Sequence, residues 1–414
     1  MITFIHTADI HFGVENYGKI DPKTGIHSRL TDFETSLNLC IDYALEQKVD
    51  FFLFSGDAYK TANPTPTQQK LLLRCFLRLH AARIPVVIIV GNHDNPLSFG
   101  KANSLEIFGD LPVEGFYVIA KPELLVLNTQ HGPVQIAGIP WPTRNTVNLN
   151  KRSTTEAFDE VTNYITKALG TIITTLAAQC DPTIPSVLAG HLTVASGIFS
   201  GSEKRAIYGT DPTLFSSQLA IEPFDYVALG HLHRYQNLNP TGYPAVVYSG
   251  SIDRVDFGER KETKGFCIVH LARNKTIHTF KELPTRPFIQ IEATLTDKYE
   301  EQTALILEKI AAANIAHAIV KILYHIPAGV KDCVHIPSIE QACLKAHYLV
   351  SITPVYQITE RQKRRGVTIE KDLNTLLNAY FQDKTETANK KNMLVQKALA
   401  LYEAAASETA TESD

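Results

Sequence analysis

Residues with metal-binding side chains recur along the chain directly after apolar runs. In chain order they are Asp9 and His11, Asp57, Asn92, His191, and His231 with His233. Side chains two residues apart at a strand end point to the same face, so Asp9 and His11 can grip one ion. Carboxylates, imidazoles and an amide oxygen together suit manganese, iron or zinc better than calcium. The pattern therefore predicts a site for divalent transition-metal ions.

The apolar runs that precede these residues alternate with stretches of helical periodicity. The runs lie at 2–11, 49–57, 84–94, 134–141, 186–191, 226–233 and 245–251. Helical spacing of apolar residues occurs at 30–47, 68–82 and about 154–179. This alternation indicates a layered α/β domain, and in such sheets ligands gather at the carboxyl ends of the strands. We therefore expect the metal-binding side chains to meet at one edge.

The motifs follow the order DxH, GD, GNHD, GH and GHxH, which resembles the calcineurin-like metallophosphoesterases. The resemblance implies a two-sheet α/β sandwich with a centre of two divalent cations, for which it favours manganese. By the same resemblance, Asp9, His11 and His233 would bind the first cation, and Asn92, His191 and His231 the second. Asp57 would bridge both, because nearby cations repel and a shared carboxylate offsets that repulsion.

His93 is left beside the metals without being a ligand. Its expected catalytic role is to donate a hydrogen bond or a proton to the phosphate or the leaving oxygen, with the adjacent Asp94 as its orienting carboxylate. Some relatives carry a histidine at the position of Lys60, and others do without it. A lysine is a flexible point charge, so we leave Lys60 out of the catalytic set and keep a phosphate contact as an open alternative.

Several longer stretches are similar to a narrower family, the SbcD-type exonuclease subunits of DNA double-strand break repair. They include FIHTADIHFG, VIIVGNHD, VALGHLHRYQ and, as the most diagnostic, YSGSIDRVDFGERKETKGF at 248–266. This resemblance implies a homodimeric, metal-dependent nuclease with exonuclease and endonuclease activity on double-stranded DNA ends and hairpins, acting in DNA repair, recombination and replication. It also implies an SbcC-type coiled-coil ABC ATPase as partner. The sequence has no GxxxxGK[ST] motif, as expected if ATP binds to that partner.

The chain divides into four expected segments. They are a metallophosphoesterase nuclease domain at 1–282, a small α/β capping domain facing DNA at 286–357, helices that dock on the ATPase at 366–406, and a disordered tail at 407–414. The prolines of LPTRP at 283–287 favour an extended linker. The basic cluster RQKRR at 361–365 is either a solvated linker or ATPase contact, or a DNA contact.

The composition places further bounds on the protein. A net charge of −3 gives no global attraction to nucleic acid, so contacts with DNA must be local, for which Lys204, Arg205, Arg234 and Arg254 are candidates. The six cysteines form no CxxC pair, which argues against a disulfide framework and fits a reducing cytoplasm. The sequence shows no apolar run of the roughly 18 residues needed to span a membrane.

Two other functions stay open at this point. One is a phosphodiesterase or phosphatase for a small molecule, although such an enzyme has no need of a capping domain or terminal helices. The other is a DNA-tethering scaffold without catalysis, although every expected ligand position is filled. Trp141, at the rim of the expected site, either packs there or stacks on a base.

Overall fold

Two six-stranded sheets form the centre of the protein in the computed structural model, which describes residues 1–96, 101–143, 158–201, 211–357, 373–382 and 390–411. The first sheet has the order β14-β13-β1-β2-β3-β4 and the second β11-β12-β10-β7-β6-β5. The first comprises β1 (Ile2–Thr7), β2 (Phe51–Phe54), β3 (Val86–Ile89), β4 (Phe116–Ile119), β13 (Gly265–Leu271) and β14 (Ile277–Glu282). The second comprises β5 (Glu123–Thr129), β6 (Gly132–Ile139), β7 (Ser186–His191), β10 (Tyr226–Gly230), β11 (Gln236–Asn237) and β12 (Ala245–Tyr248).

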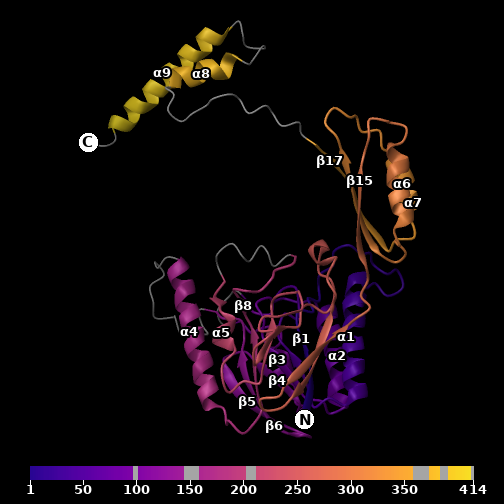
Figure 1. The fold of residues 1–414 in the computed structure, drawn as a ribbon, viewed down its shortest axis with the longest axis vertical. Helices are drawn as coiled ribbons and strands as arrows, with labels where there is room; N and C mark the ends of the chain where they lie inside the picture. The colour runs from indigo at the N-terminus through magenta and orange to yellow at the C-terminus, as the bar shows by residue number, and fades with distance from the viewer. Residues whose placement is uncertain (97–100, 144–157, 202–210, 358–372, 383–389, 412–414) are drawn as a thin grey trace.

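The strands that precede the motif residues are parallel within each sheet. β1, β2, β3 and β4 pair in parallel, as do β6, β7, β10 and β12, whereas β13, β5 and β11 pair antiparallel with their neighbours. The carboxyl ends of the parallel strands therefore meet at one end of the molecule. β1 starts near the N-terminus at the bottom of Figure 1 and runs upward, so the carboxyl ends of these strands lie at the upper end of the sandwich.

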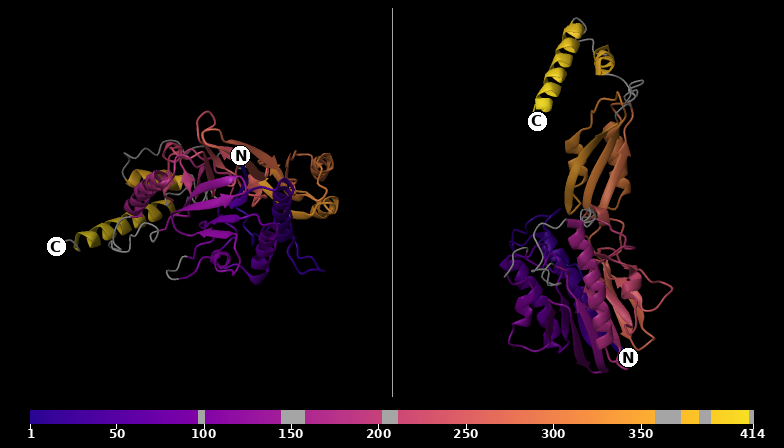
Figure 2. Two further views of the ribbon diagram at one scale, coloured as in Figure 1. Left: turned by 90° about the horizontal axis from the view of Figure 1, so that it is seen from below. Right: turned by 90° about the vertical axis from the view of Figure 1, so that its left-hand side faces the viewer.

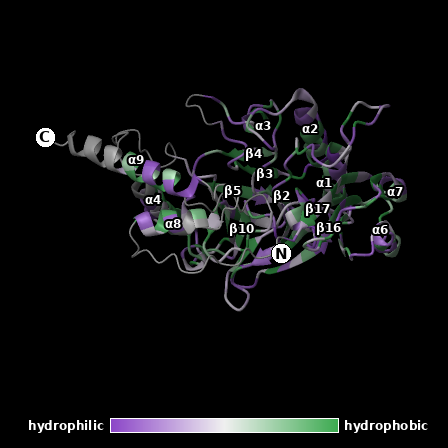
Figure 3. Ribbon diagram, turned by 90° about the horizontal axis from the view of Figure 1, so that it is seen from above, coloured by the Kyte–Doolittle hydropathy of each residue, from purple (hydrophilic) through white to green (hydrophobic). Residues whose placement is uncertain are grey.

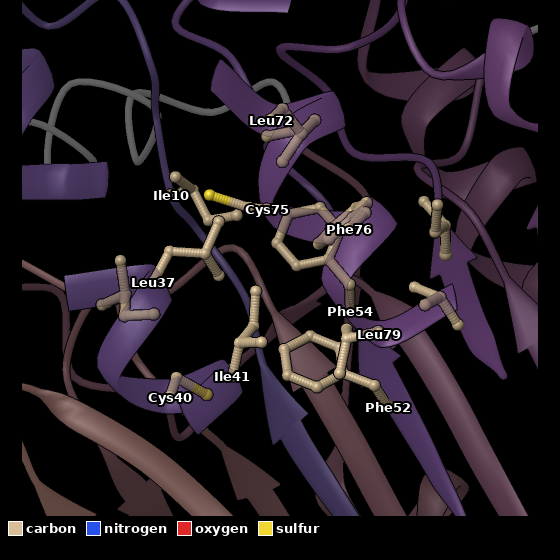
Figure 4. Close-up of a cluster of buried hydrophobic side chains, with 14 of the residues drawn as sticks. Ile10, Leu37, Cys40, Ile41, Phe52, Phe54, Leu72, Cys75, Phe76 and Leu79 are labelled. Carbon is tan, nitrogen blue, oxygen red and sulfur yellow. The ribbon is translucent and has the colours of Figure 1, made fainter. Parts of the chain in front are cut away.

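Three apolar layers hold the sheets and helices together. Side chains of both sheets, such as Phe4 and Val247, interdigitate in the middle layer, which confirms the expected two-sheet sandwich. α4 (Phe158–Gln179) covers the outer face of the second sheet. α1 (Ser28–Gln47) and α2 (Pro66–Ala81) cover the first sheet, where Leu37 and Phe76 pack with Phe52 (Figure 4). Figure 3 shows apolar residues along the central strands and polar residues on peripheral helices.

The start of α2 is stabilised by a reciprocal cap. Thr65 accepts a hydrogen bond from the Gln68 N–H at 3.4 Å, the Gln68 side chain accepts one from the Thr65 N–H at 2.9 Å, and Pro66 occupies the first turn. Such a box satisfies amide groups that have no partner inside the helix. This cap places α2 directly after the loop that carries Asp57.

Thr65→Ala is expected to lower the free energy of unfolding by about 1 kcal/mol, because it removes the side-chain acceptor of this cap. Urea denaturation followed by circular dichroism measures the change. Thr67→Ala is the matched control, since Thr67 is an exposed position inside the same helix. An equal loss in both variants would show that the cap does not stabilise the helix start.

A second, smaller sheet follows residues 283–287, which form no helix or strand. It consists of the parallel strands β15 (Phe288–Thr294), β16 (Ile319–Ile326) and β17 (Tyr348–Tyr356). α6 (Gln302–Ala312) and α7 (Ile336–Ala342) cover one of its faces through residues such as Ile306 and Ile339. Figures 1 and 2 show this unit above the sandwich, at the end where the parallel strands terminate.

Helices α8 (Leu373–Gln382) and α9 (Lys391–Thr411) pack on each other at the C-terminal end. Val395 is buried, whereas Leu401, six residues further along α9, is exposed. α9 continues to Thr411, so the expectation of a disordered tail from 407 was wrong for these residues; an alanine-rich sequence is a good helix former. Within the described ranges, no helix has the length and apolar character needed to cross a membrane.

Candidate metal centre

The loops after five parallel strands bring the predicted metal-binding residues together. β1 leads to Asp9 and His11, β2 to Asp57, β3 to Asn92, β7 ends at His191, and β10 leads to His231 and His233. Their ligand atoms form three overlapping groups, each within 4.8 Å: Asp9–His11–His233, His11–Asp57–His93, and Asp57–His191–His231. All members except His93 are buried. Residues separated by more than 200 positions in the sequence therefore share one site.

The first group is centred on two imidazole rings. The Nε2 atoms of His11 and His233 lie 3.0 Å apart. The Asp9 carboxylate sits in the same group and accepts a hydrogen bond from the His231 backbone N–H at 3.1 Å. This arrangement leaves one carboxylate and two ring nitrogens facing a common point.

The group of Asp57, His191 and His231 lies around the Asn92 side-chain oxygen. Asn92 Oδ1 lies 2.9 Å from His191 Nε2 and 3.2 Å from His231 Nδ1. Asp57 Oδ2 lies 3.3 Å from His191 Nε2 and 3.8 Å from His11 Nε2. The Asp57 carboxylate therefore stands between the two groups.

The hydrogen bonds of two histidines determine which nitrogen faces the site. His191 Nδ1 lies 2.7 Å from the Ser55 carbonyl and His233 Nδ1 lies 2.8 Å from the Glu259 carboxylate. Because both partners are acceptors, each Nδ1 carries a proton, and in the neutral ring each Nε2 presents a lone pair to the site. Oxygen atoms and ring nitrogens thus converge, and such a set of donor atoms fits divalent cations.

Close approach explains why glycine precedes Asp57 and Asn92. A Cβ on Gly56 would lie 2.4 Å from His191 Nδ1, and Gly56 has a φ of +97°. A Cβ on Gly91 would lie 2.2 Å from Asp57 Oδ1. Any side chain at either position would displace a candidate metal ligand, His191 in the first case and Asp57 in the second.

The backbone at this site is strained. Asp9, His11, Asp57 and His231 have φ values of 53°, 54°, 59° and 103°, in the left-handed region that non-glycine residues rarely adopt. Conformations of this kind cost on the order of 1–3 kcal/mol each and concentrate where function requires them. The rest of the fold holds these side chains in place at a cost in stability.

Burial and the Asp57 charge act against each other on the pKa values of the site. Burial lowers the pKa of His231 to about 3 and holds that of His11 well below its usual range, so both rings are neutral at neutral pH. Burial also lowers the pKa of His191, but the Asp57 carboxylate outweighs it and raises that pKa to about 9. His191 Nε2 is therefore the nitrogen at which positive charge is most favoured.

His93 is exposed at the edge of the site and is held by the main chain. Its Nδ1–H donates to the Lys60 carbonyl at 2.8 Å, and its ring centroid lies 5.0 Å from that of His11. The side chain of Lys60 is exposed. The sequence could not predict this contact, because every residue has a backbone carbonyl and the identity of Lys60 therefore says nothing about it.

Asp94 does not orient His93 as expected, and that role was wrong. Its carboxylate is fully buried and accepts hydrogen bonds from the N–H groups of Gly91 at 3.0 Å, Asp57 at 2.8 Å and Ala58 at 3.0 Å. Burial raises the pKa of Asp94 to about 7. Asp94 instead ties the loop after β2 to the loop after β3, which sets the position of Asp57.

One further group near the site, Glu259, was not assigned from the sequence, and it lies behind His233. Trp141, which the sequence placed at the rim of the site, has its indole 4.9 Å from the ring centroid of His231. Burial raises the pKa of Glu259, but the Lys264 ammonium outweighs it and holds that pKa well below its usual range. The sequence signal that could have identified Glu259 was the motif at 248–266, which contains both Glu259 and Lys264.

The basic residues named as DNA contacts differ in their surroundings. Arg234 is exposed beside His233. Arg254 is half-buried and donates hydrogen bonds to Thr285 Oγ1 at 2.6 Å and to the Glu262 carbonyl at 2.7 Å. Its guanidinium is therefore engaged within the protein, and the expected phosphate contact from this side chain was wrong. Lys204, Arg205 and the cluster at 361–365 lie outside the described residues.

Comparison with known proteins supports the resemblance that the motifs indicated. A family model described as calcineurin-like phosphoesterase matches residues 2–235. The SbcD subunit of the nuclease SbcCD from Staphylococcus saprophyticus is 28% identical over 330 residues, which cover 78% of this chain and 79% of that protein. These two matches confirm the resemblance inferred from the motifs.

Two solved structures are similar to this chain at low sequence identity. A dimetal phosphatase from Danio rerio is 11% identical, with a TM-score of 0.41, and the match covers 68% of this chain and 96% of that one. The protein TT1561 of Thermus thermophilus is 12% identical, with a TM-score of 0.36, and the match covers 67% of this chain and 98% of that one.

Proposed function

Because the chain belongs to the calcineurin-like phosphoesterase family and is a hydrolytic phosphodiesterase, we propose that it is a DNA nuclease subunit acting at DNA ends. The observation that carries the proposal is the extent of similarity to the nuclease subunit. Its 330 aligned residues exceed the phosphoesterase match at 2–235, so the likeness includes chain outside the catalytic fold. A small-molecule phosphatase has no need of that additional chain.

The metal ligands divide into two proposed sets with a shared member. One cation is held by Asp9, His11 and His233, the other by Asn92, His191 and His231, with Asp57 between them. The convergence of oxygen and nitrogen atoms within 2.9–3.8 Å of one another supports this division. The mixed donor set fits manganese, iron or zinc, and we take manganese as the metal because the resemblance to the metallophosphoesterases favours it. When bound, the two cations lower the pKa of a water and stabilise negative charge on the phosphate.

The side chains of the protein supply orientation and proton transfer. His93 is exposed at the mouth of the site and anchored at Nδ1 by the Lys60 carbonyl, so its Nε2 is free to face a substrate. A doubly protonated His93 donates from Nε2 to the leaving oxygen. Asp94 holds the two loops that set the distance between His93 and Asp57.

The remaining segments are proposed to serve the substrate and the partner. The unit at 286–357 stands at the metal end of the sandwich and would face DNA ends or hairpins. The segment at 366–406, which includes α8 and most of α9, would dock on an SbcC-type ATPase. The chain would act as a homodimer in a reducing cytoplasm, which the free cysteines fit.

The decisive experiment is degradation of linear duplex DNA by the purified chain with its ATPase partner and Mn²⁺. Chelation by EDTA should stop the reaction, and bis-p-nitrophenyl phosphate serves as a small diester substrate. Hydrolysis of the small diester without any cleavage of DNA, even with ATP and the partner present, would refute the nuclease proposal. DNA binding without hydrolysis of either substrate would favour a tethering scaffold.

Deletion of residues 366–414 should abolish co-purification with the ATPase while the sandwich keeps its fold. The physical reason is that Leu401 of α9 is exposed although Val395 is buried, and a short helix pair gains stability when an external surface covers such apolar residues. Pull-down of the truncated and full-length chains measures the effect. Survival of the complex after truncation would place the docking surface elsewhere.

A further inference from the structure

A buried ion pair lies directly behind His233. Glu259 and Lys264 are 0% and 1% exposed, and Glu259 Oε2 lies 2.7 Å from Lys264 Nζ. The other carboxylate oxygen, Oε1, accepts the Nδ1–H of His233 at 2.8 Å. Burying two charges costs desolvation free energy, which is offset only when the remaining hydrogen bonds of both groups are satisfied. Such a pair directly behind a candidate ligand therefore indicates a role at the site.

The pair is fully hydrogen-bonded, and it holds His233 at two points. Lys264 Nζ donates to the His233 carbonyl at 2.9 Å, to Ser251 Oγ at 2.9 Å and to Glu262 Oε2 at 3.0 Å. Glu259 Oε2 also accepts from the Val255 N–H at 3.0 Å. The ring of His233 is therefore fixed by Glu259 and its backbone carbonyl by Lys264.

We propose that Glu259 is a positioning residue for the cation held by Asp9, His11 and His233, and that Lys264 keeps its carboxylate in place. The inference rests on the ligand sets of the proposed function. A carboxylate on Nδ1–H selects the tautomer that presents the Nε2 lone pair and makes that nitrogen a stronger donor to a metal. Two other imidazoles of the site have main-chain anchors instead: His191 uses the Ser55 carbonyl and His93 the Lys60 carbonyl.

Titration of the intact chain with Mn²⁺, followed by calorimetry and by the EPR signal of free Mn²⁺, tests this role. Glu259→Ala should weaken one of the two Mn²⁺ sites by about 10–100-fold and leave the other unchanged. Glu259→Gln should lose less, because its amide oxygen still accepts the Nδ1–H. Asp225→Asn is the control, a buried carboxylate held by Arg273 at the opposite end of β10.

Glu259→Ala removes the carboxylate that lies nearest to the buried Lys264 ammonium, leaves Glu262 as the remaining ion-pair partner named above, and can fail to fold. The double variant Glu259→Gln with Lys264→Met removes both charges with little change of shape, and it should weaken the same Mn²⁺ site. Wild-type affinity for both Mn²⁺ ions in this folded double variant and in Glu259→Ala would overturn the inference.

The Mn²⁺ concentration needed for half-maximal DNA cleavage separates this inference from the proposed function. In Glu259→Ala it should rise by about 10–100-fold, with much of the rate recovered at saturating Mn²⁺. If the wild type cuts no DNA, the proposed function fails, while weakened Mn²⁺ binding in the variants still supports the positioning role. If the wild type cuts DNA and the variants bind Mn²⁺ normally, only the positioning role fails.

Discussion

Asp57→Ala is expected to abolish cleavage of DNA and to lower the Mn²⁺ content of the protein. Two divalent cations about 4 Å apart repel by roughly 16 kcal/mol at an effective dielectric constant near 20, and a shared carboxylate offsets much of this. Asp57 is the carboxylate that stands between the two groups of ligands, 3.3 Å from His191 Nε2 and 3.8 Å from His11 Nε2. Its removal should leave too little negative charge to hold both cations.

The expected loss in cleavage rate is about 10³-fold or more, since one electrostatic group in an active site is commonly worth about 10²–10³ and this one serves two cations. Metal content by mass spectrometry and cleavage of linear duplex DNA are the two measurements. Asp57→Asn, which keeps the shape and removes the charge, should show the same losses.

Asp50→Asn is the matched control for Asp57. Asp50 is a buried carboxylate just before β2, and it accepts a hydrogen bond from the Thr3 N–H at 2.8 Å, far from the metal end. It should keep full metal content whatever its effect on stability. Normal metal content and normal cleavage in Asp57→Asn would contradict a bridging role.

His93→Ala is expected to lower the cleavage rate by about 10²–10⁴-fold, the range for loss of a general acid, with metal content unchanged. The His93 ring is exposed, whereas the proposed histidine ligands are buried, and its Nδ1–H donates to the Lys60 carbonyl. Its removal should therefore leave the metal ligands in place. The same geometry would also let His93 join His11 and Asp57 around an ion. Metal content is therefore the decisive measurement, and a loss of metal in His93→Ala would make His93 a ligand instead of an acid.

Lys60→Ala distinguishes the main chain of Lys60 from its side chain. The variant keeps the carbonyl that accepts the His93 Nδ1–H, so a role limited to that contact predicts little change in rate. A large rise in KM for DNA with an unchanged kcat would instead indicate that the lysine side chain contacts phosphate. Steady-state cleavage kinetics separate the two outcomes.

Some elements were predictable because their signals are local. Helical periodicity placed one helix at 30–47 and the structure has α1 at Ser28–Gln47, since an amphipathic helix repeats its apolar face over several turns. β4, β5 and β14 were missed. β5 carries the short apolar run LLVL at 124–127, which by itself does not distinguish a strand from a helix, and only Leu127 of it is buried because β5 lies at a sheet edge.

The sequence alone determined which residue types occur at the candidate metal centre and which strand each of them follows. Each such signal, an apolar strand with a polar side chain after it, lies within about ten consecutive residues. Only the tertiary structure decided which hydrogen-bond partners these side chains have. His93 meets a carbonyl 33 residues away, and His233 meets a carboxylate 26 residues away. Asp94, adjacent to His93 in sequence, turns away from it toward backbone amides. Hydrogen bonds depend on direction and distance in space, and neighbours in sequence need not be partners.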